Sequence, residues 1–236
     1  MPNRASGGPT KTVVRTRVLT AGPGARFASI AAAMAEARAG DTVEVLTAEY
    51  REQVQLKNGV SLQSRVPRGA SLRAAPMSAG PAVLAESVTG ARFAGFVIVA
   101  DQALPLSTGI LLRDSAVEVT DVEVKGAGVG IEIRGTANPV LRANTIRDCA
   151  AEGVLILGAS TPWLAHNLIQ NNNGAGVAAR DGARPSLLGN VFEKNAVELP
   201  VDMDMDAVRK QNFFLDAGQG HTLPRAGRAI RARSPK

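Results

Sequence analysis

Hydrophobic and polar residues alternate with two different periods along this chain. Residues 27–38 (FASIAAAMAEAR) carry four apolar side chains at the spacing of one helix face: Phe27, Ile30, Met34 and Ala37. The sequence therefore predicts a short amphipathic helix that ends at Gly40. From Asp41 onward the period becomes two residues, which predicts short strands separated by turns; the first of these segments are 42–46, 54–56 and 60–62.

A 23-residue repeat occupies residues 128–196. Its three units read GVGIEIRGTANPVLRANTIRDCA, AEGVLILGASTPWLAHNLIQNNN and GAGVAARDGARPSLLGNVFEKNA. Four columns agree in all three: Gly130, Gly153 and Gly176; Pro139, Pro162 and Pro185; Leu141, Leu164 and Leu187; Ile146, Ile169 and Phe192. Repetition of this length predicts stacked units that each contact only their neighbours. A leucine-rich repeat is excluded because it needs further leucines where the first unit has Thr136 and Pro139.

These observations predict an all-β fold, a right-handed parallel β-helix of roughly eight coils with three short strands per coil. Looser copies of the unit precede the repeat at 93–100 and 109–127. One column holds only asparagine: Asn144, Asn167, Asn190 and Asn212. Stacked asparagine side chains can hydrogen-bond to one another, and asparagine tolerates the left-handed backbone of a sharp turn. We therefore interpret this column as a structural ladder and not as a binding site.

Over residues 18–217 the chain resembles the pectate-lyase-like right-handed β-helix proteins and their bacterial relatives. The resemblance rests on FASIAAAMAEARAGDTVEVLTAEYREQVQL and on the GI-x-I and N-x-I patterns. It implies an N-terminal capping α-helix followed by a first coil, although Thr47 and Ala48 stand where relatives usually have Pro-Gly. Residues 1–17 are expected to be a flexible linker, and residues 218–236 a disordered basic tail.

The composition and charge of the chain limit the classes of partner that it is expected to bind. The chain has 45% hydrophobic but only 3% aromatic residues, which suits thin stacked elements. Its net charge of +6 comes from the ends: residues 1–20 and 218–236 together carry +9, which leaves −3 (6 minus 9) on residues 21–217. The basic net charge therefore predicts no specific nucleic-acid groove in the folded part of the chain.

A single cysteine excludes an internal disulfide framework, and no apolar run reaches the roughly 18 residues of a membrane span. Lacking a signal sequence, the chain is expected in the cytoplasm as written, or outside it if the N-terminus is a domain boundary.

Enzymes of the family that the chain resembles mostly act on acidic polysaccharide, and their catalytic sets are missing here. The polygalacturonase-like Asp-Asp, Gly-His-Gly and Arg-Ile-Lys segments do not occur, nor does the nucleophile segment of pectin methylesterases. Likeness to the esterases is limited to Tyr50-x-Glu52. We predict no catalytic residue and no cofactor.

Alternating acids at Asp202, Asp204 and Asp206 look like the start of a calcium loop. The sixth and twelfth positions of such a loop need Gly and Glu but hold Ala207 and Phe213. With acids first and Arg209-Lys210 last, the segment is better explained as a short helix whose charges match its dipole. No metal site is predicted.

Candidate binding residues lie on the outward side of the Gly-led strands. If Ile131 and Ile133 point inward, the residues between and after them point outward. The resulting candidate set, with the acid at its edge and the tryptophan of the next strand, is Arg113, Glu132, Arg134, Arg180, Asp181 and Trp163. An arginine row suits carboxylate or sulfate groups. Alternatively, these arginines only solubilise the strand and pair with Asp114 or Asp181.

The favoured hypothesis is a non-catalytic recognition or scaffold module that binds a polysaccharide or other glycan along an exposed strand face, with acidic polysaccharide as a candidate partner. A second hypothesis is a polysaccharide lyase or glycoside hydrolase with an atypical active site. A third is a sensor or spacer domain that contacts other domains of a larger bacterial signalling or surface protein.

Overall fold

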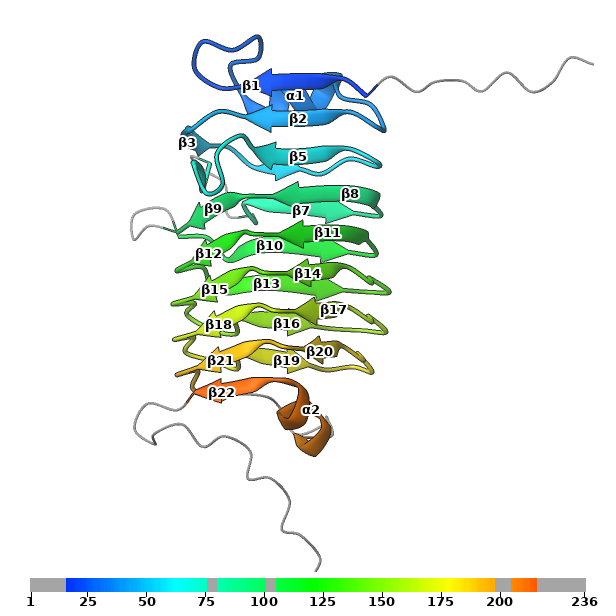
Figure 1. The fold of residues 1–236 in the computed structure, drawn as a ribbon, viewed down its shortest axis with the longest axis vertical. Helices are drawn as coiled ribbons and strands as arrows, with labels where there is room; N and C mark the ends of the chain where they lie inside the picture. The colour runs from blue at the N-terminus through cyan, green and yellow to red at the C-terminus, as the bar shows by residue number, and fades with distance from the viewer. Residues whose placement is uncertain (1–15, 76–79, 101–104, 198–204, 216–236) are drawn as a thin grey trace, which may run out of the picture.

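A computed structural model describes residues 16–75, 80–100, 105–197 and 205–215 of the chain. The chain winds through a stack of coils that begins at the top of Figure 1 with strand β1 and ends at the bottom with strand β22. Every strand pair in the described residues is parallel, and three sheets run along the stack. The predicted parallel β-helix is confirmed.

Strands with the same place in successive coils form one sheet. Within the described residues, sheet A contains β1 (Val18–Ala21), β2 (Thr42–Val45), β5 (Ser61–Ser64), β8 (Thr89–Ala94), β11 (Ala116–Thr120), β14 (Val140–Arg142), β17 (Trp163–Ala165) and β20 (Ser186–Leu188). Sheet B contains β3 (Ala48–Arg51), β6 (Ala70–Arg73), β9 (Phe96–Val99), β12 (Glu123–Lys125), β15 (Thr145–Arg147), β18 (Leu168–Gln170), β21 (Val191–Glu193) and β22 (Phe213–Leu215). Sheet C contains β4 (Val54–Gln55), β7 (Val83–Glu86), β10 (Thr108–Arg113), β13 (Val129–Arg134), β16 (Val154–Ile156) and β19 (Val177–Ala179).

The register between coils follows the sequence repeat. Leu141 pairs with Leu164, and Leu164 with Leu187, so that equal positions of the repeat lie directly above one another. Because neighbouring parallel strands lie about 4.8 Å apart, each inward side chain packs on its counterpart in the next coil. The core columns are Ile110, Ile131, Val154 and Val177 in sheet C, the three leucines in sheet A, and Val124, Ile146, Ile169 and Phe192 in sheet B. Burial of each such side chain contributes about 1.5–3 kcal/mol.

The glycine that opens each Gly-led strand is needed because the chain passes close to the core. A β-carbon on Gly130 would lie 2.4 Å from a side-chain carbon of Ile146, and one on Gly153 would lie 2.9 Å from the equivalent atom of Ile169. Any larger residue would push the strand away from the stack. The repeated Gly-Ile pattern is therefore a packing requirement.

The asparagine column forms the predicted ladder. In each of the four residues the side chain is buried. The Oδ1 atom of Asn167 accepts hydrogen bonds from the Nδ2 and backbone N–H groups of Asn144, both at 3.0 Å, and its own Nδ2 donates to Asn190 at 2.9 Å. Asn190 is bonded to Asn212 in the same way. The ladder thus links four coils through the turn between sheets A and B.

A second, shorter ladder was missed by the sequence analysis. At the turn that follows sheet B, Asn172 donates from Nδ2 to Oδ1 of Asn195 at 2.8 Å. One coil earlier the same position holds Cys149, whose backbone N–H donates to Asn172. The signal was available, since Cys149, Asn172 and Asn195 share one column of the 23-residue alignment.

Two short helices lie at the ends of the described stack. Helix α1 (Ile30–Glu36) covers the first coils, and it begins three residues later than predicted because the Ser29 hydroxyl caps it by accepting from the Ala32 N–H at 3.1 Å. Helix α2 (Met205–Gln211) lies against β20, with an acid in its first turn and two bases in its last, as predicted.

Neither of these helices is long and apolar enough to cross a membrane. Most of the segments predicted to be linker and basic tail fall at 1–15 and 216–236, outside the described residues, as do Asp202 and Asp204.

Candidate functional site

Five of the six candidate residues lie on or next to the outer face of sheet C. Arg113 pairs in register with Arg134, and Leu111 with Glu132. Arg180 follows β19 at the same position two coils further on, with Leu157 in the coil between. The register thus places these arginines in one row, which Leu157 interrupts.

Each of these arginines is paired with a glutamate. Arg113 Nη1 lies 2.6 Å from Glu86 Oε1, and Arg180 Nη2 lies 2.8 Å from Glu152 Oε1. Arg134 pairs with Glu132 in its own strand. The positive charge of the row is therefore balanced by carboxylates of the same protein.

Glu132 is the most enclosed member of this face, with only 5% of its surface exposed. Its Oε1 atom accepts from Arg134 Nε at 2.5 Å, and its Oε2 accepts from the Thr108 hydroxyl at 3.3 Å. A buried carboxylate requires such partners, because an uncompensated charge away from water is costly. The contacts of Glu132 are those of a structural ion pair on the sheet surface.

The alternative partners Asp114 and Asp181 were predicted wrongly. Both have left-handed backbone angles, with φ values of 48° and 59°, and so belong to the turns that end their strands. The Asp114 carboxylate accepts from the backbone N–H of Thr136 at 2.9 Å and thereby closes the turn of the next coil. In the described part of the chain, the arginines of the row form their ion pairs with glutamates instead.

Trp163 lies apart from this row, on β17 of sheet A. Inward residues of both sheets contribute to one core, so the outer faces of sheets A and C point away from it in different directions. The indole is 41% exposed, which is high for so large an apolar side chain. One ligand segment cannot lie on Trp163 and on the arginine row together.

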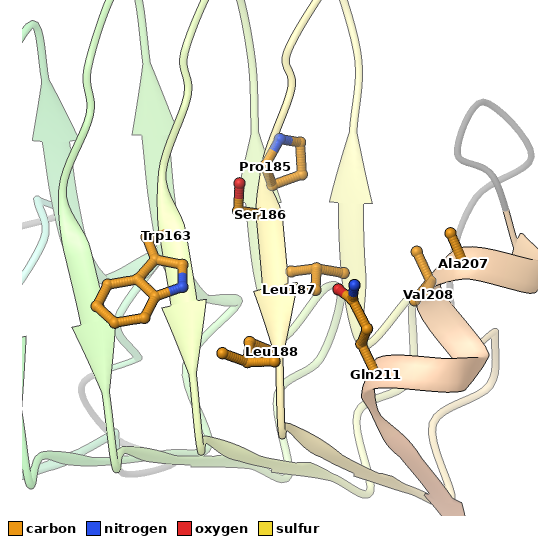
Figure 2. Close-up of a pocket in the computed structure, with 8 residues that line it drawn as sticks. All are labelled: Trp163, Pro185, Ser186, Leu187, Leu188, Ala207, Val208 and Gln211. Carbon is orange, nitrogen blue, oxygen red and sulfur yellow. The ribbon is translucent and has the colours of Figure 1, made fainter.

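An open groove of about 430 Å³ lies beside Trp163, between strands β17 and β20 and helix α2. Figure 2 shows the indole on β17 at one end of the groove and Gln211 on α2 at the other, with Ser186, Leu187 and Leu188 of β20 between them. The residues that line the groove are Trp163, Pro185, Ser186, Leu187, Leu188, Ala207, Val208 and Gln211.

The repeat register builds one wall of the groove. Ser186 pairs with Trp163 and Leu188 with Ala165, so that a small polar residue and an exposed leucine follow the indole along the outer face. The buried side chain of Val208 holds the other wall, helix α2, against the stack. The last rung of the ladder fixes the end of that helix, since Asn212 Nδ2 donates to the Val208 carbonyl at 2.9 Å.

Ser186, Leu188 and Gln211 were not among the residues predicted from the sequence. The first two stand 23 residues after Trp163 and Ala165, and the repeat could have identified them. Gln211 lies in a helix outside the repeat, and its position follows only from the three-dimensional packing.

Tyr50 and Glu52 have structural roles, and His166 lies at a turn. Both Glu52 carboxylate oxygens accept from the first N–H groups of α1, at Ile30 (2.9 Å) and Ala31 (2.8 Å). The Tyr50 hydroxyl donates to the Leu46 carbonyl at 2.8 Å. In this protein, Glu52 of the Tyr50-x-Glu52 motif therefore caps the start of helix α1. His166 lies at an exposed turn with a φ of 56° and is not packed in the core.

A family model described as right handed beta helix region matches residues 108–225. The chain belongs to the right-handed β-helix family. This β-helix is similar to the pectin methylesterase of Aspergillus niger in its deglycosylated form, with 9% identity, a TM-score of 0.54, and coverage of 84% of this chain and 83% of the enzyme. A form of that enzyme with an N-acetylglucosamine stub gives 10% identity, a TM-score of 0.55, and coverage of 89% and 88%.

A tailspike protein, gp49 of the Acinetobacter baumannii bacteriophage Fri1, described as a capsular polysaccharide depolymerase, is 12% identical. Its TM-score is 0.49, and the alignment covers 66% of this β-helix and 41% of the tailspike. The likeness to the two forms of the Aspergillus niger enzyme, at identities of 9% and 10%, shows a shared fold and nothing more. A search of curated proteins finds no significant match.

Proposed function

We propose that this β-helix is a non-catalytic recognition module that binds a glycan on an outer strand face, with the Trp163 groove as its site. The observation that carries the proposal is the exposed indole at the edge of an open groove that also holds a hydroxyl and an amide. An aromatic ring offers a flat apolar surface to the C–H face of a sugar, and neighbouring polar groups can bond its hydroxyls.

The form of the stack supports recognition of a chain-like ligand. Parallel coils present side chains at a regular spacing of about 4.8 Å along each face, a rigid scaffold that needs little reordering when a ligand binds. In the groove, Trp163 and Ser186 occupy adjacent coils at the same register position.

A glycan array on the intact protein, repeated with Trp163→Ala, tests the proposal. We expect binding to a defined set of glycans that the variant loses. Phe213→Ala is the matched control, because Phe213 is also an exposed aromatic residue, at 61%, but lies on sheet B away from the groove. An array without any bound glycan would refute glycan recognition, and an unchanged pattern with Trp163→Ala would exclude the groove.

The arginine row of sheet C is a second candidate site, for acidic glycans. The observation in its favour is that the exposed ion pairs of Arg113 and Arg180 contribute little stability and can be exchanged for ligand carboxylates. Loss of acidic-glycan binding in Arg113→Ala/Arg180→Ala, with binding retained in Trp163→Ala, would assign recognition to this row.

A further inference from the structure

The groove beside Trp163 has a lining without charge. None of the eight described lining residues has an ionisable side chain; five are aliphatic or proline residues of the sheet and the helix, and the polar groups come from Ser186, Gln211 and the indole N–H. Trp163 and Leu188 give the groove its apolar surface, with 41% and 44% exposure.

Two arginines near the groove have partners outside it. Arg142, which precedes Ala165 in the same outer column of sheet A, points toward Glu118, with an N···O distance of 3.7 Å. Arg209 of helix α2 lies over the Phe214 ring, 5.9 Å from its centre. Neither side chain belongs to the groove lining.

This chemistry discriminates between glycan classes. A carboxylate or sulfate loses hydration when it enters a groove, and it regains that energy only from a cation or from several strong donors. An uncharged sugar loses much less, because its C–H face is apolar and its hydroxyls both donate and accept. Ser186 and Gln211 can likewise both donate and accept hydrogen bonds, and the indole adds one donor.

We infer that the groove accepts a neutral polysaccharide, with one uncharged pyranose unit stacked on Trp163 beside Ser186 and the chain continuing toward Gln211 at the other end of the groove. This inference rests on the proposed glycan-binding function and specifies its ligand class. The site differs from the arginine row, whose chemistry suits acidic chains, in position as well as in charge.

The single tryptophan of the chain makes the test specific to this site. Indole fluorescence is followed while the intact protein is titrated with neutral hexasaccharides of glucose, mannose, xylose and galactose and with hexagalacturonate. Each hexose oligomer is paired with its C6-oxidised form, and hexagalacturonate with its methyl ester, so that the members of a pair differ in charge. We expect a saturable change with at least one neutral sugar and a dissociation constant at least about tenfold higher for its acidic partner, a factor that fluorescence resolves.

Variants separate stacking from folding. Trp163→Phe keeps an aromatic face and is expected to retain binding by calorimetry, whereas Trp163→Ala loses it, with circular dichroism confirming that both are folded. Phe213→Ala should bind and fluoresce like the original protein.

Equal or tighter binding of the acidic partner with a Trp163 signal would overturn the neutral-ligand inference and leave glycan recognition intact. Glycans that bind on the array without any indole response would overturn the groove as the site. Silence in both experiments would refute the proposed function itself.

Discussion

Glu52 and Lys57 hold opposite ends of helix α1 from the same segment of chain. The Glu52 carboxylate accepts from the first two N–H groups of the helix, and Lys57 Nζ donates to the carbonyls of Met34 and Ala37 at 3.3 and 2.6 Å. A seven-residue helix is too short to be stable alone, so these bonds and its buried face keep it on the stack.

Removal of either cap should therefore destabilise the N-terminal end. We expect Glu52→Gln and Lys57→Met each to lower the free energy of unfolding by about 1 kcal/mol, because a charge-assisted bond to a helix end is lost while the size of the side chain is kept. Urea denaturation measures the effect, with the exposed Gln55→Ala as control. Equal stability of all three variants would show that the caps are not needed.

Asn167→Ala should be among the most damaging single changes. It leaves buried polar groups of Asn144 and the Leu141 carbonyl without partners, at about 1 kcal/mol or more for each lost bond and about 3 kcal/mol in total. Asn173→Ala, in the same coil but exposed, should change stability by less than about 0.5 kcal/mol. Similar losses for both variants would contradict the ladder as the cause.

Arg134 and Arg113 differ in what their removal leaves behind. Arg134→Ala strands the buried Glu132 carboxylate and should cost about 3 kcal/mol, whereas Arg113→Ala breaks an exposed pair with Glu86 and should cost about 0–1 kcal/mol. Thermal and urea unfolding compare the two. If Arg113→Ala is the more destabilising variant, burial of the paired carboxylate does not determine the cost of losing an arginine on the outer face of sheet C.

Asp41 is expected to make the free energy of unfolding depend on pH in the acidic range. Hydrogen bonds from the Arg17 guanidinium and from the Arg38 backbone N–H hold the pKa of Asp41 well below its usual value. A carboxylate with a lowered folded-state pKa stabilises the protein above its unfolded pKa of about 3.9, and this contribution is lost as pH falls toward the folded pKa.

We therefore expect the stability difference between the original protein and Asp41→Asn to be constant from about pH 6 to 8 and to shrink below about pH 4. Denaturation at a series of pH values measures it. A difference that stays constant down to pH 2 would show that ionisation of Asp41 is not the cause.

Cys149 should be unreactive in the folded protein. Burial raises the pKa of its thiol to about 12, so that hardly any thiolate forms at neutral pH, and the side chain is inaccessible. Labelling with a thiol reagent at pH 8 should become rapid only in denaturant, in step with unfolding followed by circular dichroism. Rapid labelling without denaturant would mean that this coil opens locally.

The repeat made the architecture predictable. In a parallel stack each residue lies above its counterpart one coil away, so equal spacing in sequence becomes contact in space. That is why the inward columns, the Gly-Ile packing points and the ladder of Asn144 to Asn212 could all be inferred from residue positions alone. The second ladder, from Asn172 to Asn195, follows the same rule.

Contacts between residues that do not occupy the same position of the repeat could not be inferred in this way. Arg180 has Asp181 beside it in sequence yet pairs with Glu152, which is 28 residues away in sequence and which the fold brings within 2.8 Å of the guanidinium. The Trp163 groove exists because helix α2, which breaks the period, packs against β20 and brings Gln211 to the indole side of the sheet. The sequence by itself determined the stacked architecture, because stacking depends on residues that recur at a fixed period. Only the tertiary structure decided the ion pairs and the groove, because both depend on the positions of residues that do not follow the repeat.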